Sequence, residues 1–256
     1  VVNDWCYHGT VDETLVILDE EGKTVSRPGA IGPQVHPGVT TIAVPFNDLA
    51  AMERALEDGE VACVLMEPAL TNIGIVLPQS GYLEGVRQLT RKYGVILILD
   101  ETHTICAGPQ GASRLWGIEA DMLVIGKTIG GGIPVAAYGM SAEVARQVES
   151  LMHGHDLDVS GIGGTLSGSA LAGAAIRATL THALRQEDFD IAIPLATRWS
   201  EGVQNVINQY HLPWTVQQLG CRAEYWFSEH PQNGAQAAAS VNDSLESYMH
   251  IYALNR

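Results

Sequence analysis

The sequence predicts an α/β fold, with a mostly parallel central sheet flanked by helices and part of a smaller α+β domain towards the C-terminus. Two observations lead to this prediction. Short runs such as Val95–Leu99 and Met122–Ile125 have no polar face, as expected of strands buried between two layers of helices. These runs alternate with longer segments in which apolar residues recur at helical spacing, a pattern typical of α/β proteins.

The first part of the chain contains two predicted helices with a strand between them. Asp48 is of a residue type that caps helix N-termini, and Gly59 follows the last apolar residue of the pattern, so the first helix lies between them. Val61–Met66 is then an apolar run of strand length. The second helix opens at Gly81 and ends at Gly94, with apolar residues between them at helical spacing.

Two of the next strands end at residues able to carry chemistry. Val95–Leu99 is followed by Asp100, and Met122–Ile125 is followed by Gly126 and Lys127. Ligands of open α/β sheets bind outside the carboxyl ends of the strands, so Asp100 and Lys127 are the first candidates for a site. The remaining expected elements of this region are the strand Pro134–Met140 and the helices Ala142–Met152 and Ser169–Leu184.

The character of the sequence changes after Gln186. We therefore expect a large domain over residues 1–187 and part of a C-terminal domain over residues 188–256. Its expected elements are the helix Ile191–Tyr210, the strands Trp214–Gln217 and Cys221–Phe227, and a last helix. Because Val1 is not an initiator methionine and Tyr248–Arg256 carries no helix stop signal, we expect the chain to be a piece of a longer protein.

Composition excludes several classes of function. The formal net charge of −15 over 256 residues argues against nucleic acid as a partner, which favours a basic surface, and against docking on an anionic membrane. No apolar run approaches the length of a membrane span, and the N-terminus carries no secretion signal. The scattered cysteines form no CxxC pair, which indicates reduced thiols in a cytoplasmic protein.

Lysine is rare in this sequence, and one lysine has an unusual setting. Lys23 lies in a polar turn and Lys92 at an exposed helix end, whereas Lys127 follows an apolar strand and precedes a glycine-rich segment. A lysine in a partly desolvated pocket becomes a nucleophile. A lysine that only reaches for water from a strand end is an equally good interpretation of its position.

Asp100 admits three interpretations on its own: it pairs with a ligand cation, binds metal, or caps the next helix. A metal site has little support, because His153-Gly154-His155 is short and isolated, and we expect no bound metal. Gly126-Lys127-Thr128 is not the end of a P-loop, since Asp121 stands where that motif needs glycine.

Several segments together carry a resemblance to a known family. They occur in the family's order with comparable spacing, and the resemblance covers nearly the whole chain. The segments are Cys6-Tyr7-His8-Gly9, Glu67-Pro68 with Asn72 and Gly74, Leu99 through Thr104, Asp121 through Gly132 with Pro134, and Gly164 through Gly168. The set resembles the class III pyridoxal-phosphate aminotransferases, in particular their glutamate-1-semialdehyde 2,1-aminomutase-like branch. The resemblance implies the large domain of the fold-type I enzymes and pyridoxal 5′-phosphate as the cofactor.

The resemblance assigns the two catalytic roles to Lys127 and Asp100. Lys127 would form the Schiff base with the cofactor aldehyde, and its freed amine would later move the proton between Cα and C4′. Asp100 would pair with the protonated pyridine nitrogen, which keeps the ring an electron sink. Glu67 and Glu101 would support these residues from behind.

The same resemblance assigns further cofactor contacts. Tyr7 would stack on the ring with His8 beside it, Thr102 would pack on the other face, and Asn72 would bind the 3′ oxygen. Thr165 would reach the phosphate of the neighbouring subunit's cofactor, which implies a homodimer with a shared site. Each of these side chains also has an ordinary structural interpretation, as a core aromatic, a turn residue or a helix cap.

The sequence departs from the family pattern after Asp100-Glu101, where Thr102-His103-Thr104-Ile105 stands in place of the common Val, Gln or Met, Thr, Gly. His103 would face the 3′ oxygen of the cofactor and bind it or the substrate, and a buried, uninvolved histidine is an equal alternative. The family's Ser-Gly-Thr phosphate loop would lie upstream of Val1.

The implied function is transfer of an amino group between an amine or amino acid donor and a carbonyl acceptor, as in a transaminase or aminomutase. Two alternatives stay open. Another fold-type I enzyme, such as a decarboxylase or a racemase-like relative, would use the same lysine and aspartate. An inactive fragment without the phosphate loop would have the motifs but no activity.

Overall fold

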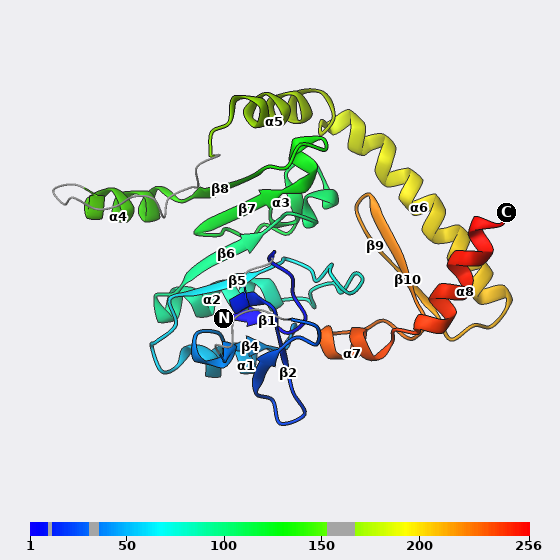
Figure 1. Ribbon diagram of the computed structural model, residues 1–256, viewed down its shortest axis with the longest axis horizontal. Helices are drawn as coiled ribbons and strands as arrows, with labels where there is room; N and C mark the ends of the chain where they lie inside the picture. Colours follow the sequence, from blue (N-terminus) through cyan, green and yellow to red (C-terminus); the bar gives the residue numbers. More distant parts are fainter. Residues whose placement is uncertain (10–11, 31–35, 153–166) are drawn as a thin grey trace.

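The computed structural model describes residues 1–9, 12–30, 36–152 and 167–256, and it is an α/β structure (Figure 1). Its main sheet has the strand order β5-β6-β7-β8. The first three strands are parallel and β8 is antiparallel to β7. The bounds of the strands are β5 Cys63–Met66, β6 Ile96–Asp100, β7 Met122–Gly126 and β8 Ala136–Met140. The predicted fold class is therefore confirmed.

Three smaller sheets of two strands accompany the main sheet. β1 and β4 are parallel, whereas β2 with β3 and β9 with β10 form antiparallel pairs. Their bounds are β1 Val2–Asn3, β2 Val16–Leu18, β3 Thr24–Ser26, β4 Ala43–Val44, β9 Thr215–Leu219 and β10 Arg222–Trp226.

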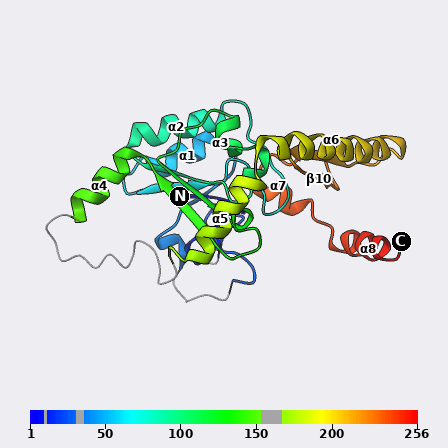
Figure 2. The ribbon, with the colours of Figure 1, turned by 90° about the horizontal axis from the view of Figure 1, so that it is seen from above.

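Helices cover both sides of the main sheet. Figure 2 shows α1, α2 and α3 together on one side of it, with α5 on the other. The α-helices are α1 Leu49–Leu56, α2 Tyr82–Tyr93, α3 Gly111–Leu115, α4 Ala142–Met152, α5 Ala170–His182, α6 Gln186–Gln209, α7 Gly234–Ala239 and α8 Asp243–Leu254. The 3-10 turns are η1 Asp12–Thr14, η2 Pro37–Val39, η3 Thr104–Ala107 and η4 Lys127–Gly130. None of the helices in the described ranges is long and apolar enough to cross a membrane.

The first two helices form for the reasons that the sequence suggests. The Asp48 side chain accepts a hydrogen bond of 2.8 Å from the backbone N–H of Ala51, which caps α1. Gly94 ends α2 in the left-handed conformation, and its N–H returns to the carbonyls of the last turn. The apolar faces of both helices pack into the main core with Phe46, Leu97 and Leu99. This burial is the main stabilising contribution to the part of the fold beneath the site.

Two expectations about the C-terminal half need adjustment. Helix α6 begins at Gln186 rather than Ile191, which places Pro194 in its third turn, and the expected domain boundary after residue 187 falls in its first turn. The domain division stays a prediction. Trp226 and Ala237 from the C-terminal part belong to the same core cluster as the N-terminal strands, so packing does not separate these regions sharply.

A paired charge fixes α2 to the sheet. The Arg87 guanidinium donates to both carboxylate oxygens of Asp121 at 2.6 and 2.8 Å, and Asp121 also accepts from the backbone N–H of Leu97 at 2.8 Å. The two side chains are only 15% and 22% exposed. The Arg87 hydrogen bonds hold the pKa of Asp121 below its usual range. This contact holds the start of β7, and therefore Lys127 at its end, in register with β6.

We predict that Arg87→Met lowers the free energy of unfolding by about 1–3 kcal/mol, because it leaves the half-buried Asp121 carboxylate without its bidentate partner. The matched control is Arg91→Met on the same helix. Arg91 pairs with Glu119 at 3.2 Å, but the side chains are 61% and 83% exposed, so we expect a change below roughly 0.5 kcal/mol. Urea unfolding at pH 7 measures both, and equal effects would contradict the assigned role of Asp121.

Candidate active site

The sheet brings Asp100 and Lys127 to the same edge. Asp100 is the last residue of β6, Lys127 directly follows β7, and the two strands are parallel with Asp100 opposite Val124. The carboxyl ends of neighbouring parallel strands meet at one edge, where α/β proteins bind ligands. The placement of both residues is therefore as predicted, while their chemical roles stay predictions.

A cavity of about 410 Å³ opens between these strand ends. Asp100 and Lys127 contribute its charged groups, and Tyr7 contributes an aromatic ring. The lining residues are Tyr7, His8, Gly9, Asp100, Thr102, Val124, Gly126, Lys127, Pro134, Val135 and Ala136. Four residues predicted from the N-terminal motif and the strand ends thus line it together with Thr102.

The Asp100 carboxylate is held in one orientation from two directions. One oxygen lies 2.7 Å from His8 Nδ1 and the other accepts from the backbone N–H of Thr102 at 3.0 Å. Burial by itself would raise the pKa of Asp100, but the hydrogen bonds from His8 and Thr102 outweigh it and lower the pKa. Asp100 is therefore a carboxylate at neutral pH, ready to pair with a cation in the cavity.

His8 is buried behind Asp100, with a side chain only 3% exposed. Burial tends to lower its pKa, but the hydrogen bond to Asp100 and contacts with Cys6 reverse this and raise it to about 10. His8 is then an imidazolium paired with Asp100. Its proton on Nδ1 fixes the carboxylate that faces the cavity.

A second buried carboxyl group stands behind His8. Glu67 is 3% exposed and accepts a hydrogen bond from the Thr71 hydroxyl. Burial raises the pKa of Glu67 to about 7, although the charge of His8 opposes the shift. Within the described ranges, Glu67 Oε1 and His8 Nε2 are both buried without a hydrogen-bond partner. Burying a polar atom without a hydrogen-bond partner costs free energy. The imidazolium of His8 attracts the Glu67 carboxylate electrostatically, which offsets part of this cost.

We expect Glu67→Gln to change how stability depends on pH. A raised carboxyl pKa means that the folded state binds more protons than the unfolded state between about pH 4.5 and 7, so the wild type loses stability as pH rises through that window. The glutamine cannot ionise, so the free energy of unfolding of the variant relative to wild type should rise from pH 5 to pH 8. The upper bound is roughly 3 kcal/mol for a shift of this size.

Urea unfolding at pH 5 and pH 8 measures this difference, with the exposed Glu57→Gln as the matched control. The control should show no pH-dependent difference from wild type, because Glu57 is exposed at the end of α1. A flat difference for Glu67→Gln as well would show that Glu67 is ionised in the folded protein throughout.

Lys127 has a strained backbone and two specific neighbours. Its φ is 47°, in the left-handed region that side-chain-bearing residues seldom adopt, and such strain clusters at functional sites. Its Nζ lies 5.5 Å from the centre of the Tyr7 ring and 2.6 Å from His103 Nε2. The side chain is exposed rather than desolvated, so neighbours and not burial set its chemistry here.

Asn72 is not among the residues that line the Lys127 cavity. The Asn72 side chain donates to the Trp5 carbonyl at 3.5 Å and lines a separate cavity of about 830 Å³. Gly74, at φ 96°, holds this loop so close to Trp226 that a Cβ there would lie 2.4 Å from the indole. Thr165 lies outside the described residues. Both assignments stay predictions.

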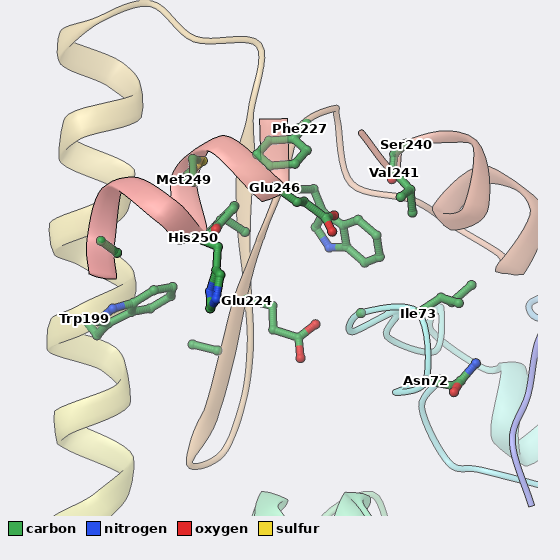
Figure 3. Close-up of a pocket in the computed structure, with 15 residues that line it drawn as sticks. Asn72, Ile73, Trp199, Glu224, Phe227, Ser240, Val241, Glu246, Met249 and His250 are labelled. Atoms are coloured by element: carbon green, nitrogen blue, oxygen red, sulfur yellow. The ribbon is translucent and has the colours of Figure 1, made fainter. Parts of the chain in front are cut away.

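The larger cavity lies between three elements of the C-terminal part and the 72–74 loop. In Figure 3, Trp199 from α6, Glu224 from β10 and His250 from α8 face one another, and Asn72 and Ile73 lie across from them. Its walls combine aromatic and apolar side chains such as Phe227 and Met249 with the polar groups of Glu224, Glu246 and His250. None of the charged groups at Asp100 and Lys127 reaches it, so we place the chemistry in the smaller cavity.

Arg222 is a residue near the site that sequence reasoning did not single out. Its guanidinium donates to the Thr71 carbonyl at 2.9 Å and to Glu224 at 2.6 Å. It also contributes, with Lys127, to lowering the pKa of His103, after burial as the main cause. Arg222 lies in a hairpin far along the chain from Asp100, and no local motif marks it.

Glu101 supports the site from beneath, as the family pattern suggested. Its buried carboxylate accepts from the backbone N–H groups of Ala112 and Ser113 at 3.0 and 2.5 Å and from the Thr104 hydroxyl at 2.6 Å. These bonds fix the loop that follows β6. The described residues contain no group of three or more histidine, cysteine or acidic side chains that could hold a metal ion.

Comparison with known proteins identifies the family. The family model of the class III aminotransferases matches residues 1–236. The chain belongs to the class III aminotransferases. The glutamate-1-semialdehyde 2,1-aminomutase 2 of Exiguobacterium sibiricum is 35% identical over 95% of the chain, which covers 55% of that relative. The chain thus spans about half the length of the curated relatives that it matches.

Solved class III structures have the same fold. A glutamate-1-semialdehyde aminomutase from Pseudomonas aeruginosa PAO1 is 42% identical, with a TM-score of 0.93 over 100% of this chain and 57% of that one. A lysine-to-alanine variant of such an enzyme from the same strain was solved in complex with PMP. An omega-transaminase from Sphaerobacter thermophilus is 29% identical, with a TM-score of 0.78 over 94% of this chain and 56% of that one.

Proposed function

We propose that this class III aminotransferase chain carries the catalytic centre of a pyridoxal-phosphate-dependent enzyme that transfers an amino group between an amine or amino acid and a carbonyl compound. The observation that carries the proposal is the placement of the Lys127 amine and the Asp100 carboxylate at one cavity with the Tyr7 ring. The relatives include both an aminomutase and a transaminase, which supports amino-group transfer as the reaction class.

The residues present fit the cofactor. Lys127 would supply the amine for its aldehyde, Asp100 would supply a carboxylate for its ring nitrogen, and Tyr7 and Thr102 would supply surfaces for its ring faces; all four line the cavity. When bound, pyridoxal phosphate supplies an electron sink for the pair of electrons released at the substrate Cα. His8 and Asn72 are the further contacts that the resemblance assigns, and Thr165 is assigned to the phosphate across a subunit interface.

The residues of the chain would have separate roles in holding and moving protons. Asp100 stays ionised because His8 and Thr102 donate to it, so it would be able to pair with a protonated ring nitrogen of the cofactor. The Lys127 amine is the one lysine nitrogen of the sequence at this cavity, and it would be the group that moves a proton at the substrate carbon, as the resemblance implies. Glu67 lies behind His8, and the charge of His8 opposes the rise in the pKa of Glu67.

Product analysis tests the proposal against its alternatives. The chain is incubated with pyridoxal phosphate, an amino acid and a 2-oxo acid, and the products are followed by mass spectrometry. Formation of the new amino acid supports amino transfer. Release of carbon dioxide supports a decarboxylase, and loss of optical purity alone supports a racemase-like relative. Binding of cofactor without any product supports the inactive fragment that lacks the phosphate loop.

We propose further that the chain works as a homodimer in the cytoplasm. Large apolar side chains are exposed on α5 and β8, including Leu171, Leu180 and Tyr138, and such surfaces are seldom left bare. All four cysteines are free, as suits a reducing compartment. Light scattering after size-exclusion chromatography tests the dimer, and a monomeric mass at micromolar concentration would contradict it.

A further inference from the structure

The contact between Lys127 and His103 has no counterpart in the roles assigned so far. Lys127 Nζ lies 2.6 Å from His103 Nε2, within hydrogen-bond distance. His103 is the first residue before η3 at the end of β6, and Lys127 begins η4 at the end of β7. Because β6 and β7 are parallel neighbours, the segments that carry His103 and Lys127 leave the sheet at the same edge.

Two nitrogens at this separation share one proton. Either the Lys127 ammonium donates to the lone pair of Nε2, or an Nε2–H donates to the lone pair of the amine. A pair in which both groups are charged would carry two donors and no acceptor, which is repulsive. The geometry therefore needs one of the two nitrogens to be neutral.

The surroundings of His103 decide which group is neutral. Three charged groups face it: Asp100 from β6, Lys127 from η4 and Arg222 from β10. Burial lowers the pKa of His103, and the two cations lower it further, while Asp100 opposes them. At neutral pH the ring is uncharged, and its Nε2 lone pair faces the lysine.

Lys127 needs such a partner because its side chain is exposed. Desolvation, the usual means of activating a lysine nucleophile, is not provided by the described residues that surround it. An ammonium has no lone pair with which to attack a carbonyl carbon, so the proton has to leave first. His103 Nε2 is the acceptor within reach.

We propose that His103 is the acid–base partner of Lys127, taking a proton from Nζ when the amine attacks a carbonyl carbon and returning it when the amine is released. In this step an N–H bond of Lys127 breaks and an N–H bond at His103 Nε2 forms. The positive charge moves to the imidazole, and no electron is transferred. The proposal deepens the proposed function, because an amine that bonds reversibly to a carbonyl group is what that function asks of Lys127.

The first test is a histidine titration by NMR on the chain without cofactor. The His103 signal is assigned as the one lost in His103→Gln, and its pKa is then compared between wild type and Lys127→Met. We expect the pKa of His103 to rise in Lys127→Met, because a facing cation has been removed, and to stay unchanged in the control Lys92→Met. An unchanged titration in Lys127→Met would overturn the proposal.

The second test follows the proton transfer itself. Brief acetylation with the N-hydroxysuccinimide ester of acetic acid labels lysines by attack of the neutral amine on a carbonyl carbon. The ammonium first loses one proton, and the attacking nitrogen loses a second as the amide forms and N-hydroxysuccinimide leaves. Mass mapping gives the rate at Lys127 relative to Lys23 and Lys92, which serve as internal controls. In His103→Gln we expect the relative rate at Lys127 to fall on the order of 10²-fold at pH 7, with partial rescue by imidazole in the buffer.

Glutamine separates the proposed role from a merely positioning one. Its amide oxygen can accept a hydrogen bond from the ammonium but cannot carry the proton away. Acetylation of Lys127 in His103→Gln at the wild-type rate would therefore overturn the proposal. Neither test uses pyridoxal phosphate. If both tests give the expected results but the chain binds no cofactor, the proposed function is wrong and the acid–base role of His103 is kept. If the chain binds cofactor but either test fails, only the acid–base role of His103 is wrong.

Discussion

Lys127→Ala should abolish the covalent attachment of pyridoxal phosphate and lower amino transfer on the order of 10²–10⁴-fold through the lost proton transfer alone. The reason is positional. Lys127 is the one lysine at the cavity that holds Asp100 and Tyr7, and its Nζ lies within 2.6 Å of His103. Absorbance spectroscopy of the chain with cofactor and a coupled transamination assay measure the two effects.

The matched control for this change is Lys92→Ala. Lys92 pairs with Glu53 at 2.6 Å on the outside of α2, and its side chain is 58% exposed, so its loss should leave both measurements unchanged. Unimpaired cofactor attachment in Lys127→Ala would contradict the assignment of the nucleophile.

The left-handed backbone of Lys127 predicts that two variants at this position differ in stability. Alanine at φ 47° carries the same strain as lysine, whereas glycine adopts this conformation freely. Lys127→Gly should therefore be more stable than Lys127→Ala by roughly 1 kcal/mol, measured by urea unfolding. Equal stability would show that this backbone strain is relieved in solution.

Asp100→Asn should lower kcat on the order of 10²–10³-fold, because an amide cannot hold a proton on the cofactor's ring nitrogen as a carboxylate does. It should also lower the pKa of His8, whose rise to about 10 depends on the hydrogen bond to Asp100. NMR titration of His8 measures this second effect without cofactor. A wild-type pKa for His8 in the variant would mean that the Asp100 contact does not set its charge.

The His8–Asp100 pair also predicts the pH range in which Asp100→Asn is destabilised. A histidine with a raised pKa contributes stability that is fully present below its unfolded value near 6.5 and is lost as pH rises through its folded value near 10. The free energy of unfolding that Asp100→Asn loses relative to wild type should therefore be larger at pH 6 than at pH 10. Asp243→Asn, at an exposed position in the first turn of α8, is the control and should show no such trend.

The sequence predicted the strand-end residues well because local patterns specify them. The run before Asp100 is apolar throughout, and a strand of this kind ends where the first charge appears. The same holds for the run before Lys127. Parallel pairing then brings both residues to one edge, which is a general property of α/β sheets. The left-handed backbone of Lys127 was not predictable, because nothing in its residue type favours it.

Contacts between distant segments could not be predicted from the sequence, for a physical reason. His8 and Asp100 are 92 positions apart, and Lys127 and His103 are 24 apart, in the segments that follow two separate strands. Nothing local to either residue encodes the distance between them, which depends on how strands are ordered and registered. Only the family resemblance placed His8 and His103 near the cofactor, and it left the role of His103 open.

The antiparallel direction of β8 and the place of Asn72 show the same limit. The apolar pattern of a strand does not indicate whether the strand runs parallel or antiparallel to its neighbour. The sequence therefore predicted β8 as part of a mostly parallel sheet without predicting that it is antiparallel to β7. Asn72 belongs to a motif that resembles the family, but its loop approaches Trp226 of β10 closely at Gly74, and Asn72 lines the larger cavity rather than the one at Lys127. Packing between segments more than a hundred residues apart decided that position.

The central claim is that the chain assembles a cofactor site around Lys127, and the scarcity of lysine makes a direct measurement simple. The chain is incubated with pyridoxal phosphate and reduced with borohydride, which fixes the cofactor to the amine that holds it; digestion and mass spectrometry then locate the added mass. Lys23, Lys92, Lys127 and the terminal amine are the candidates. The account predicts label confined to Lys127. Label spread over Lys23, Lys92 and the terminus, or no label, would contradict it.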